Sequence, residues 1–266
     1  MTALAENLWT NHKDYKCYLQ RLNKHYARLD LLHINYRFPD MPLLDQYVFT
    51  DKDTLKLEKP LYNSTIRYTL DNTIPNVRSG ILVYPFVIDR SQFIRLAVFK
   101  ADGTRGDVYD LHYTKQPFAE AATVATMGDG LICNWRKKAF VSAAAMPDDE
   151  HPDGMTTVAN VVVPKEAEAP SFGLQFKGYI DVPATGIYSF YLTCDDGATL
   201  KIAGREVVNN DGMHPPKEKN GQVALKKGLH PFALDFVEGG GGYTLKLQYS
   251  KNGSAIQDVP SQWFKH

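Results

Sequence analysis

Apolar residues at every second position are the feature that most constrains how this chain can fold. Near the C-terminus this period of two runs through residues 232–236 and 243–249, in Phe232, Leu234, Phe236, Tyr243, Leu245, Leu247 and Tyr249. Such a period places alternate side chains on one face of a β-strand. Gly239–Gly242 lies between the two stretches, and we expect it to form the hairpin that joins two strands.

The same period appears earlier in the chain. From residue 47 onward it is clearest around residues 66–70 and 94–98, in Ile66, Tyr68, Leu70, Ile94, Leu96 and Val98. Residues 71–75 and 101–104 are rich in Asn, Asp and Gly, which tolerate the backbone angles of tight turns. We therefore expect a small antiparallel β-sandwich that ends near Tyr113, and further strands from Phe172 onward.

One segment follows a helical period instead. Residues 12–34 carry apolar residues three and four positions apart, which form one face of an α-helix: Tyr15, Tyr18, Leu19, Leu22, Tyr26, Leu29 and Leu32. Thr10 or Asn11 can cap the helix, and Asp14 suits its positive end. An apolar face of this kind must be buried, so we expect it to pack on the sandwich or on a second copy of the chain.

Composition excludes several classes of partner. The 266 residues contain 30 basic and 30 acidic side chains, so no overall charge draws the chain to nucleic acid. No apolar run is long enough for a membrane span. Residues 1–9 lack a basic region followed by a long apolar stretch, so the chain shows no signal peptide.

Three stretches, taken in order, resemble parts of known families. Residues 181–214 contain a strand ending in Asp195-Asp196-Gly197, a second strand and an Asn-Asn-Asp-Gly turn, and together with Gly239–Gly242 they resemble the protective-antigen (PA14) domain. The run Ile66-Arg-Tyr-Thr-Leu-Asp-Asn-Thr-Ile-Pro75 resembles the chitobiase-type C-terminal β-sandwich of family-twenty β-N-acetylhexosaminidases, with Asn72 where Gly is common and Ile74 where Glu is common. Residues 3–37 resemble the end of their catalytic barrel.

This order of parts implies a mainly β fold with an N-terminal helix and three segments. Residues 1–38 would be the last helix of a truncated barrel, 39–114 the small sandwich and 115–266 a larger PA14-type sandwich. The catalytic Asp-Glu pair of that family lies upstream of the part matched here, so we expect no catalytic residue in this chain. Glu6 and Trp9 match a structural stretch. Asp149-Glu150 is also an adjacent acidic pair, but it lies in a polar, turn-rich loop. We expect both carboxylates to be solvated there, so neither would hold a proton near neutral pH as a catalytic acid must.

The resemblance also implies a candidate site. In sugar-binding fungal members of the PA14 family, two adjacent Asp residues joined by a cis peptide hold a Ca²⁺ ion that in turn holds sugar hydroxyls. The matching positions are Asp195 and Asp196, and calcium prefers such oxygen ligands. Further oxygens would come from Asn209, Asn210 and Asp211, or from carbonyls of Gly239–Gly242.

Alternatives remain open for each of these features. An Asp-Asp-Gly turn also forms without metal, through side chains that accept backbone N–H groups. His214 and His230 have no paired ligand at metal-binding spacing. Four aromatic residues could stack on a sugar or belong to the core: Tyr188, Tyr191, Tyr243 and Trp263.

We expect the chain to be the non-catalytic C-terminal accessory part of a glycoside hydrolase that acts on terminal β-N-acetylhexosamine residues. Its PA14 domain would bind glycans or the catalytic barrel, and the parent would work in a periplasm, at a cell surface or outside the cell. Self-association through the helix is a further expectation. The alternatives are a stand-alone carbohydrate-binding or adhesion protein and a purely structural module.

Overall fold

The computed structural model describes residues 14–41, 43–44, 46–124, 127–147 and 151–266. The chain divides into two compact units. Residues 1–43, 54–86 and 93–110 belong to the first unit, and residues 44–53, 87–92 and 111–266 belong to the second. The segment boundaries expected from the sequence remain predictions.

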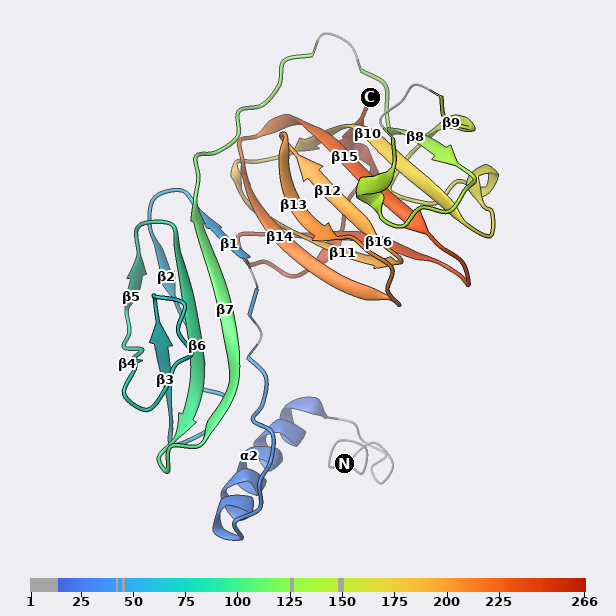
Figure 1. Cartoon of the computed structure of the whole chain (residues 1–266). Helices are drawn as coiled ribbons and strands as arrows, with labels where there is room; N and C mark the ends of the chain where they lie inside the picture. The colour runs from blue at the N-terminus through green and yellow to red at the C-terminus, as the bar shows by residue number, and fades with distance from the viewer. Residues whose placement is uncertain (1–13, 42, 45, 125–126, 148–150) are drawn as a thin grey trace. The chain divides into compact units, whose positions relative to one another are not determined.

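The expected mainly β fold is confirmed (Figure 1). The second unit contains a seven-stranded sheet. Six of its strands are hydrogen-bonded in one continuous series, and the seventh, β18 (Phe264–Lys265), pairs with β10. Their order is β13 (Arg205–Asn210), β12 (Ala198–Ile202), β15 (Gly228–Glu238), β10 (Phe172–Val182), β8 (Leu131–Arg136) and β9 (Gly154–Val158). A second, four-stranded sheet has the order β14 (Lys217–Leu225), β11 (Gly186–Asp195), β16 (Thr244–Lys251) and β17 (Gln257–Asp258).

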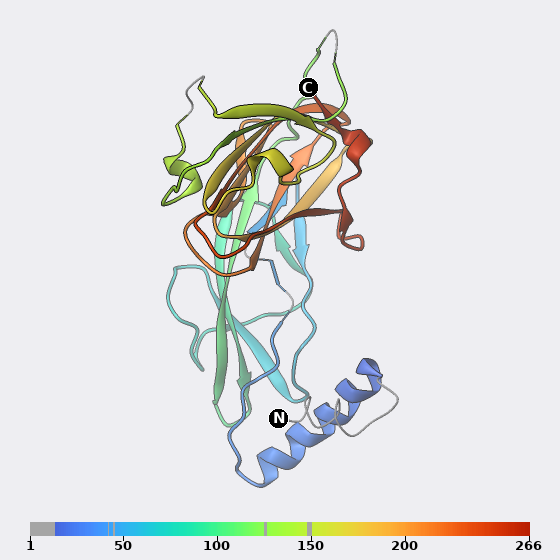
Figure 2. The ribbon, with the colours of Figure 1, turned by 90° about the vertical axis from the view of Figure 1, so that its right-hand side faces the viewer.

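The alternating side chains of both sheets form one core. Phe176 and Leu234 from the seven-stranded sheet and Phe190 from the four-stranded sheet are each fully buried in the same cluster. The second unit is therefore a β-sandwich, whose two layers appear from two directions in Figures 1 and 2.

The expected hairpin at Gly239–Gly242 is wrong. β15 pairs with β10 and β12, whereas β16 pairs with β11 and β17. The glycine run therefore connects the two sheets of the sandwich. The period of two identifies each strand, but it carries no information on which neighbour a strand pairs with.

A five-stranded sheet has the order β1 (Gln46–Phe49), β7 (Arg105–Lys115), β6 (Gln92–Lys100), β3 (Ser64–Thr69) and β4 (Gly80–Ile81), and β2 (Asp53–Leu55) pairs with β5 (Phe86–Ile88). The pairs of β3 with β4 and with β6 are antiparallel, as expected. β1 instead runs parallel to the end of β7, residues 112–115.

The helix is shorter than predicted. α2 spans Tyr15–Leu31. Asp14 has extended backbone and accepts the N–H of Cys17 at 3.0 Å, so it caps the helix, while Thr10 and Asn11 lie outside the described residues. The helix ends before His33, whose φ of +53° is left-handed. No helix in the described part of the chain is long and apolar enough to cross a membrane.

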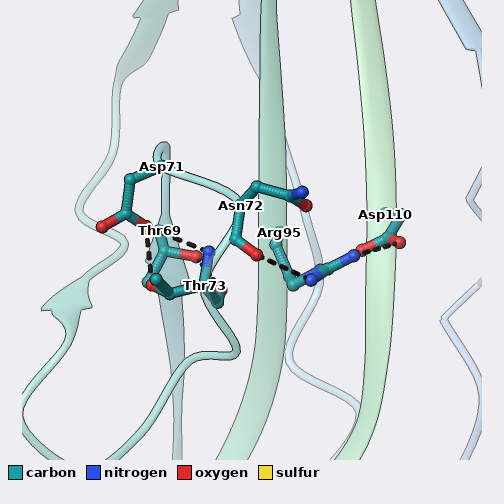
Figure 3. A network of polar contacts seen from close by, with 6 residues as sticks. All are labelled: Thr69, Asp71, Asn72, Thr73, Arg95 and Asp110. Atoms are coloured by element: carbon teal, nitrogen blue, oxygen red, sulfur yellow. Dashed lines mark hydrogen bonds and ion pairs between the residues drawn. The ribbon is translucent and has the colours of Figure 1, made fainter.

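The turn after β3 shows why the motif at residues 66–75 accepts Asn at position 72, where Gly is common (Figure 3). Asn72 has a φ of +64°, a left-handed conformation that Gly and Asn tolerate best. Its carbonyl accepts the Arg95 Nη1–H at 2.8 Å, and the same guanidinium pairs with both oxygens of Asp110 at 2.6 and 2.9 Å. Arg95 therefore ties the turn to strands β6 and β7.

Replacing this guanidinium should loosen the first unit. We expect Arg95→Met to destabilise this turn, since it removes an ion pair and a bond to a backbone carbonyl. Hydrogen–deuterium exchange of peptides covering residues 64–81 measures the effect, with the exposed Arg78→Met as the control. Equal exchange in both variants would contradict this role for Arg95.

Candidate cation site

Three carboxylates meet at one edge of the second unit. Asp195 ends β11, Asp196 follows it, and Glu238 ends β15. One oxygen of each carboxylate lies within 4.8 Å of an oxygen of the other two. The peptide bond between Asp195 and Asp196 is cis, as the resemblance implies.

Backbone pairing fixes this meeting point. The N–H of Asp196 donates to the Val237 carbonyl at 3.2 Å, and the N–H of Val237 donates to the Gly197 carbonyl at 2.8 Å. A Cβ at position 197 would lie 2.7 Å from the Gly212 carbonyl oxygen, which is too close. The close approach of the Gly212 backbone thus explains the glycine at position 197.

The Asp196 carboxylate holds two loops in place. Its Oδ1 accepts the N–H of His214 at 3.1 Å, and its Oδ2 accepts the N–H of Gly239 at 2.8 Å. The residue is 9 % exposed. These bonds leave lone pairs on both oxygens, so the carboxylate can also bind a cation.

Glu238 is the residue that sequence reasoning missed as a ligand. It is 2 % exposed, and its Oε1 accepts the N–H of Gly240 at 2.8 Å. Its Oε2 is buried and has no hydrogen-bond partner within the described part of the chain. The signal was present in the sequence, because Glu238 continues the inward-facing positions Phe232, Leu234 and Phe236 with an acidic residue.

Burial raises the pKa of Glu238, the backbone N–H groups of Gly240 and Gly242 offset part of this rise, and the charges of Asp196 and Asp195 add to it. A raised pKa means that folded Glu238 binds a proton more tightly than unfolded Glu238. The metal-free protein therefore loses stability as the pH rises from the ordinary Glu pKa through the raised one. A bound cation would relieve this cost because it favours the charged carboxylates.

The other predicted ligands have different partners. The Asn209 amide donates to Glu206 at 3.3 Å. The Asp211 carboxylate accepts the N–H groups of Ala143 and Ala144, at 2.6 and 3.1 Å, in the short helix η1 (Ala143–Ala145). Asn210 is fully buried and donates to Lys217 and Cys194, while its Oδ1 has no partner among the described residues. Their role as calcium ligands remains a prediction.

Among the described residues, no histidine or cysteine joins the three carboxylates as a softer ligand. His230 lies at the other end of β15 from Glu238, where it is buried with its Nε2 2.7 Å from the Lys226 carbonyl oxygen, as expected of a core histidine. The pKa of the Cys194 thiol rises to about 12 through burial, so it stays protonated and is a poor metal ligand. Three hard carboxylates therefore favour calcium over a transition metal.

The aromatic residues that could stack on a sugar differ in their burial. Tyr188 and Trp263 belong to the core, whereas Tyr243 is 42 % exposed and donates to Glu168 Oε1 at 2.8 Å. Asp149-Glu150, Glu6 and Trp9 lie outside the described residues.

Comparison with solved structures finds chains of similar arrangement at low identity. The PA14 domain of the MpAFP antifreeze protein is 17% identical with a TM-score of 0.45, over 54% of this chain and 94% of that one. A PA14 sugar-binding domain from an RTX adhesin is 17% identical with a TM-score of 0.46, over 52% and 98%. The epithelial adhesin 9 A domain of Candida glabrata, solved with Galβ1-3GlcNAc, is 14% identical with a TM-score of 0.41, over 53% and 91%.

Sequence comparison gives two family matches. No curated protein matches the chain. Residues 55–113 match the family described as Fn3 associated, and residues 129–263 match the PA14 domain. The PA14 match includes all three carboxylates and spans just over half of the 266 residues, so the chain belongs to the PA14 domain family.

Proposed function

We propose that this chain binds glycans through a calcium ion held by Asp195, Asp196 and Glu238. Membership of the PA14 family supports the proposal. The adjacent pair Asp195-Asp196 also resembles the calcium ligands of sugar-binding fungal members. The ion would supply a positive centre that accepts sugar hydroxyl oxygens as ligands.

The buried oxygen of Glu238 is the observation that carries the proposal. An unpaired carboxylate oxygen at 2 % exposure costs free energy unless a cation or donor satisfies it. Two further carboxylates within 4.8 Å add repulsion that a divalent cation would remove. A turn stabilised only by N–H groups accounts for the Asp196 bonds but leaves this oxygen unexplained.

Access to the cluster also fits a bulky polar ligand. Gly240, Gly241 and Gly242 are exposed with positive φ, and a Cβ at Gly241 or Gly242 would meet nothing within 4 Å. The exposed Met213 lies against Gly239, since a Cβ there would approach its Cε to 2.0 Å. A sugar could therefore approach over bare backbone beside one apolar side chain.

The order of the three resemblances along the sequence suggests which larger protein the chain belongs to. Because residues 3–37 and 66–75 resemble parts of family-twenty β-N-acetylhexosaminidases, we propose that the chain is the accessory part of such a glycosidase, which would act in the periplasm, at the cell surface or outside the cell. Its PA14 domain would then hold glycan near the catalytic barrel.

Calcium should stabilise the protein. We expect 1 mM calcium to raise the unfolding midpoint of chelator-treated protein by about 5 °C, because an ion that binds only the folded state shifts the equilibrium. Glu238→Gln should shrink this shift and raise the midpoint of the metal-free protein, since it removes a buried charge. Differential scanning calorimetry measures both values.

The exposed Asp181→Asn serves as the matched control and should change neither midpoint. An unchanged midpoint on addition of calcium or EDTA would favour the purely structural module. A full calcium shift in Glu238→Gln would remove Glu238 from the site.

Glycan binding should depend on the same ion. We expect retention on N-acetylglucosamine or galactose resin in calcium, elution by EDTA, and loss of retention in Asp195→Asn and Asp196→Ala. Asp181→Asn should be retained like the unchanged chain. Retention that is as strong in EDTA as in calcium, and as strong for Asp196→Ala as for the unchanged chain, would contradict a calcium-mediated mode of binding.

The chain alone should not hydrolyse a nitrophenyl N-acetylglucosaminide, because the Asp-Glu pair of the family lies upstream of the matched region. Release of nitrophenol, measured by absorbance against a chain carrying Asp195→Asn, tests this. Turnover would show that the assignment of the chain as an accessory part is wrong.

A further inference from the structure

The first unit contains a hollow of about 270 Å³ between α2 and the ends of two strands. Tyr26 and Asp30 line it from the helix, Tyr62 from the turn before β3, and Lys100 from the end of β6. A second, more open hollow of about 710 Å³ shares Asn23, Tyr62 and Asn63 with it. Tyr62 therefore lines both hollows.

The backbone presents Tyr62 rigidly. The side chain is 92 % exposed, yet the preceding Leu61 is 5 % exposed and belongs to the core. Ser64 is buried and donates its hydroxyl to the Leu61 carbonyl at 2.7 Å, and Asn63 has a left-handed φ of +57°. An exposed aromatic ring on a fixed turn loses little freedom when a ligand stacks on it.

Charge limits the class of ligand. The Lys100 Nζ lies 2.5 Å from Asp30 Oδ1 and 3.9 Å from the centre of the Tyr36 ring, and the Tyr36 hydroxyl donates to Asp30. A cationic ligand would find the Tyr36 face already covered by an ammonium group. In this hollow an anionic ligand would face Asp30 and Asp102, and in the second hollow a cationic ligand would face Lys24 and Lys59. A ligand that occupies both hollows is therefore favoured when it is neutral.

Polar groups suited to hydroxyls remain at the rim. The side chains of Asn23, Asn63 and Tyr62 make no hydrogen bond to any described residue, and they can donate and accept. An aromatic face beside free amide groups matches the alternation of C–H and O–H surface on a pyranose ring.

We propose that the groove along Tyr62 binds a neutral oligosaccharide, with one sugar ring stacked on Tyr62 and its neighbour in the adjoining hollow. This site lies in the first unit and uses none of Asp195, Asp196 or Glu238. It therefore does not depend on the calcium-mediated function proposed above.

Isothermal titration of the full chain in EDTA tests the proposal. The probes are cellotetraose and tetra-N-acetylchitotetraose, with the chitosan tetramer as a cationic comparison and tetragalacturonate as an anionic one. We expect a neutral tetramer to bind more tightly than both charged ones. Tyr62→Ala should weaken that binding about tenfold, because it removes the ring face on which the sugar stacks, and Tyr62→Trp should retain it.

Val83→Ala, an exposed apolar substitution in the same unit, should bind like the unchanged chain. Asp196→Ala should also bind equally, which separates this site from the calcium site. The proposal is overturned if neither neutral tetramer binds in EDTA, if a charged tetramer binds more tightly, or if Tyr62→Ala leaves the affinity unchanged.

Discussion

The antiparallel register between β12 and β15 is the constraint on which the candidate site depends. It pairs Ala198 with Phe236, so the chain just before β12 must lie beside the end of β15. This brings Asp196 to Glu238 across 42 positions of sequence and places their carboxylates in one cluster. A shift of one residue would turn Glu238 to the opposite face and separate the acidic groups.

The same constraint explains the glycine run. β15 and β16 belong to opposite sheets, so Gly239–Gly242 must cross the edge of the sandwich beside three carboxylates. Positive φ at three of these residues and the bond from Gly239 to Asp196 hold the crossing close to the acidic cluster. A crossing without side chains would leave room for a ligand beside the cluster, which a loop of larger residues would fill.

The two proposed binding sites rest on different physics. In the second unit, a cation would neutralise buried like charges, and under our proposal the ligand binds through that ion. In the first unit, Lys100, Asp30 and Tyr36 satisfy one another, so recognition there depends on an exposed ring and neutral polar groups. Calcium removal therefore separates one site from the other.

The sequence by itself determined the strands, the motif turn and the adjacent pair Asp195-Asp196, because periods and turn residues act over a few positions. It also predicted a helix, which begins after the Asp14 cap and ends at Leu31, before the left-handed His33. Strand pairing was decided only by the tertiary structure: the local alternation of β15 and β16 is the same for a hairpin as for strands in opposite sheets. The tertiary structure also places Glu238 beside Asp195 and Asp196, and it places the Asp211 carboxylate against η1. Backbone contacts between residues far apart in the sequence set both of these neighbours.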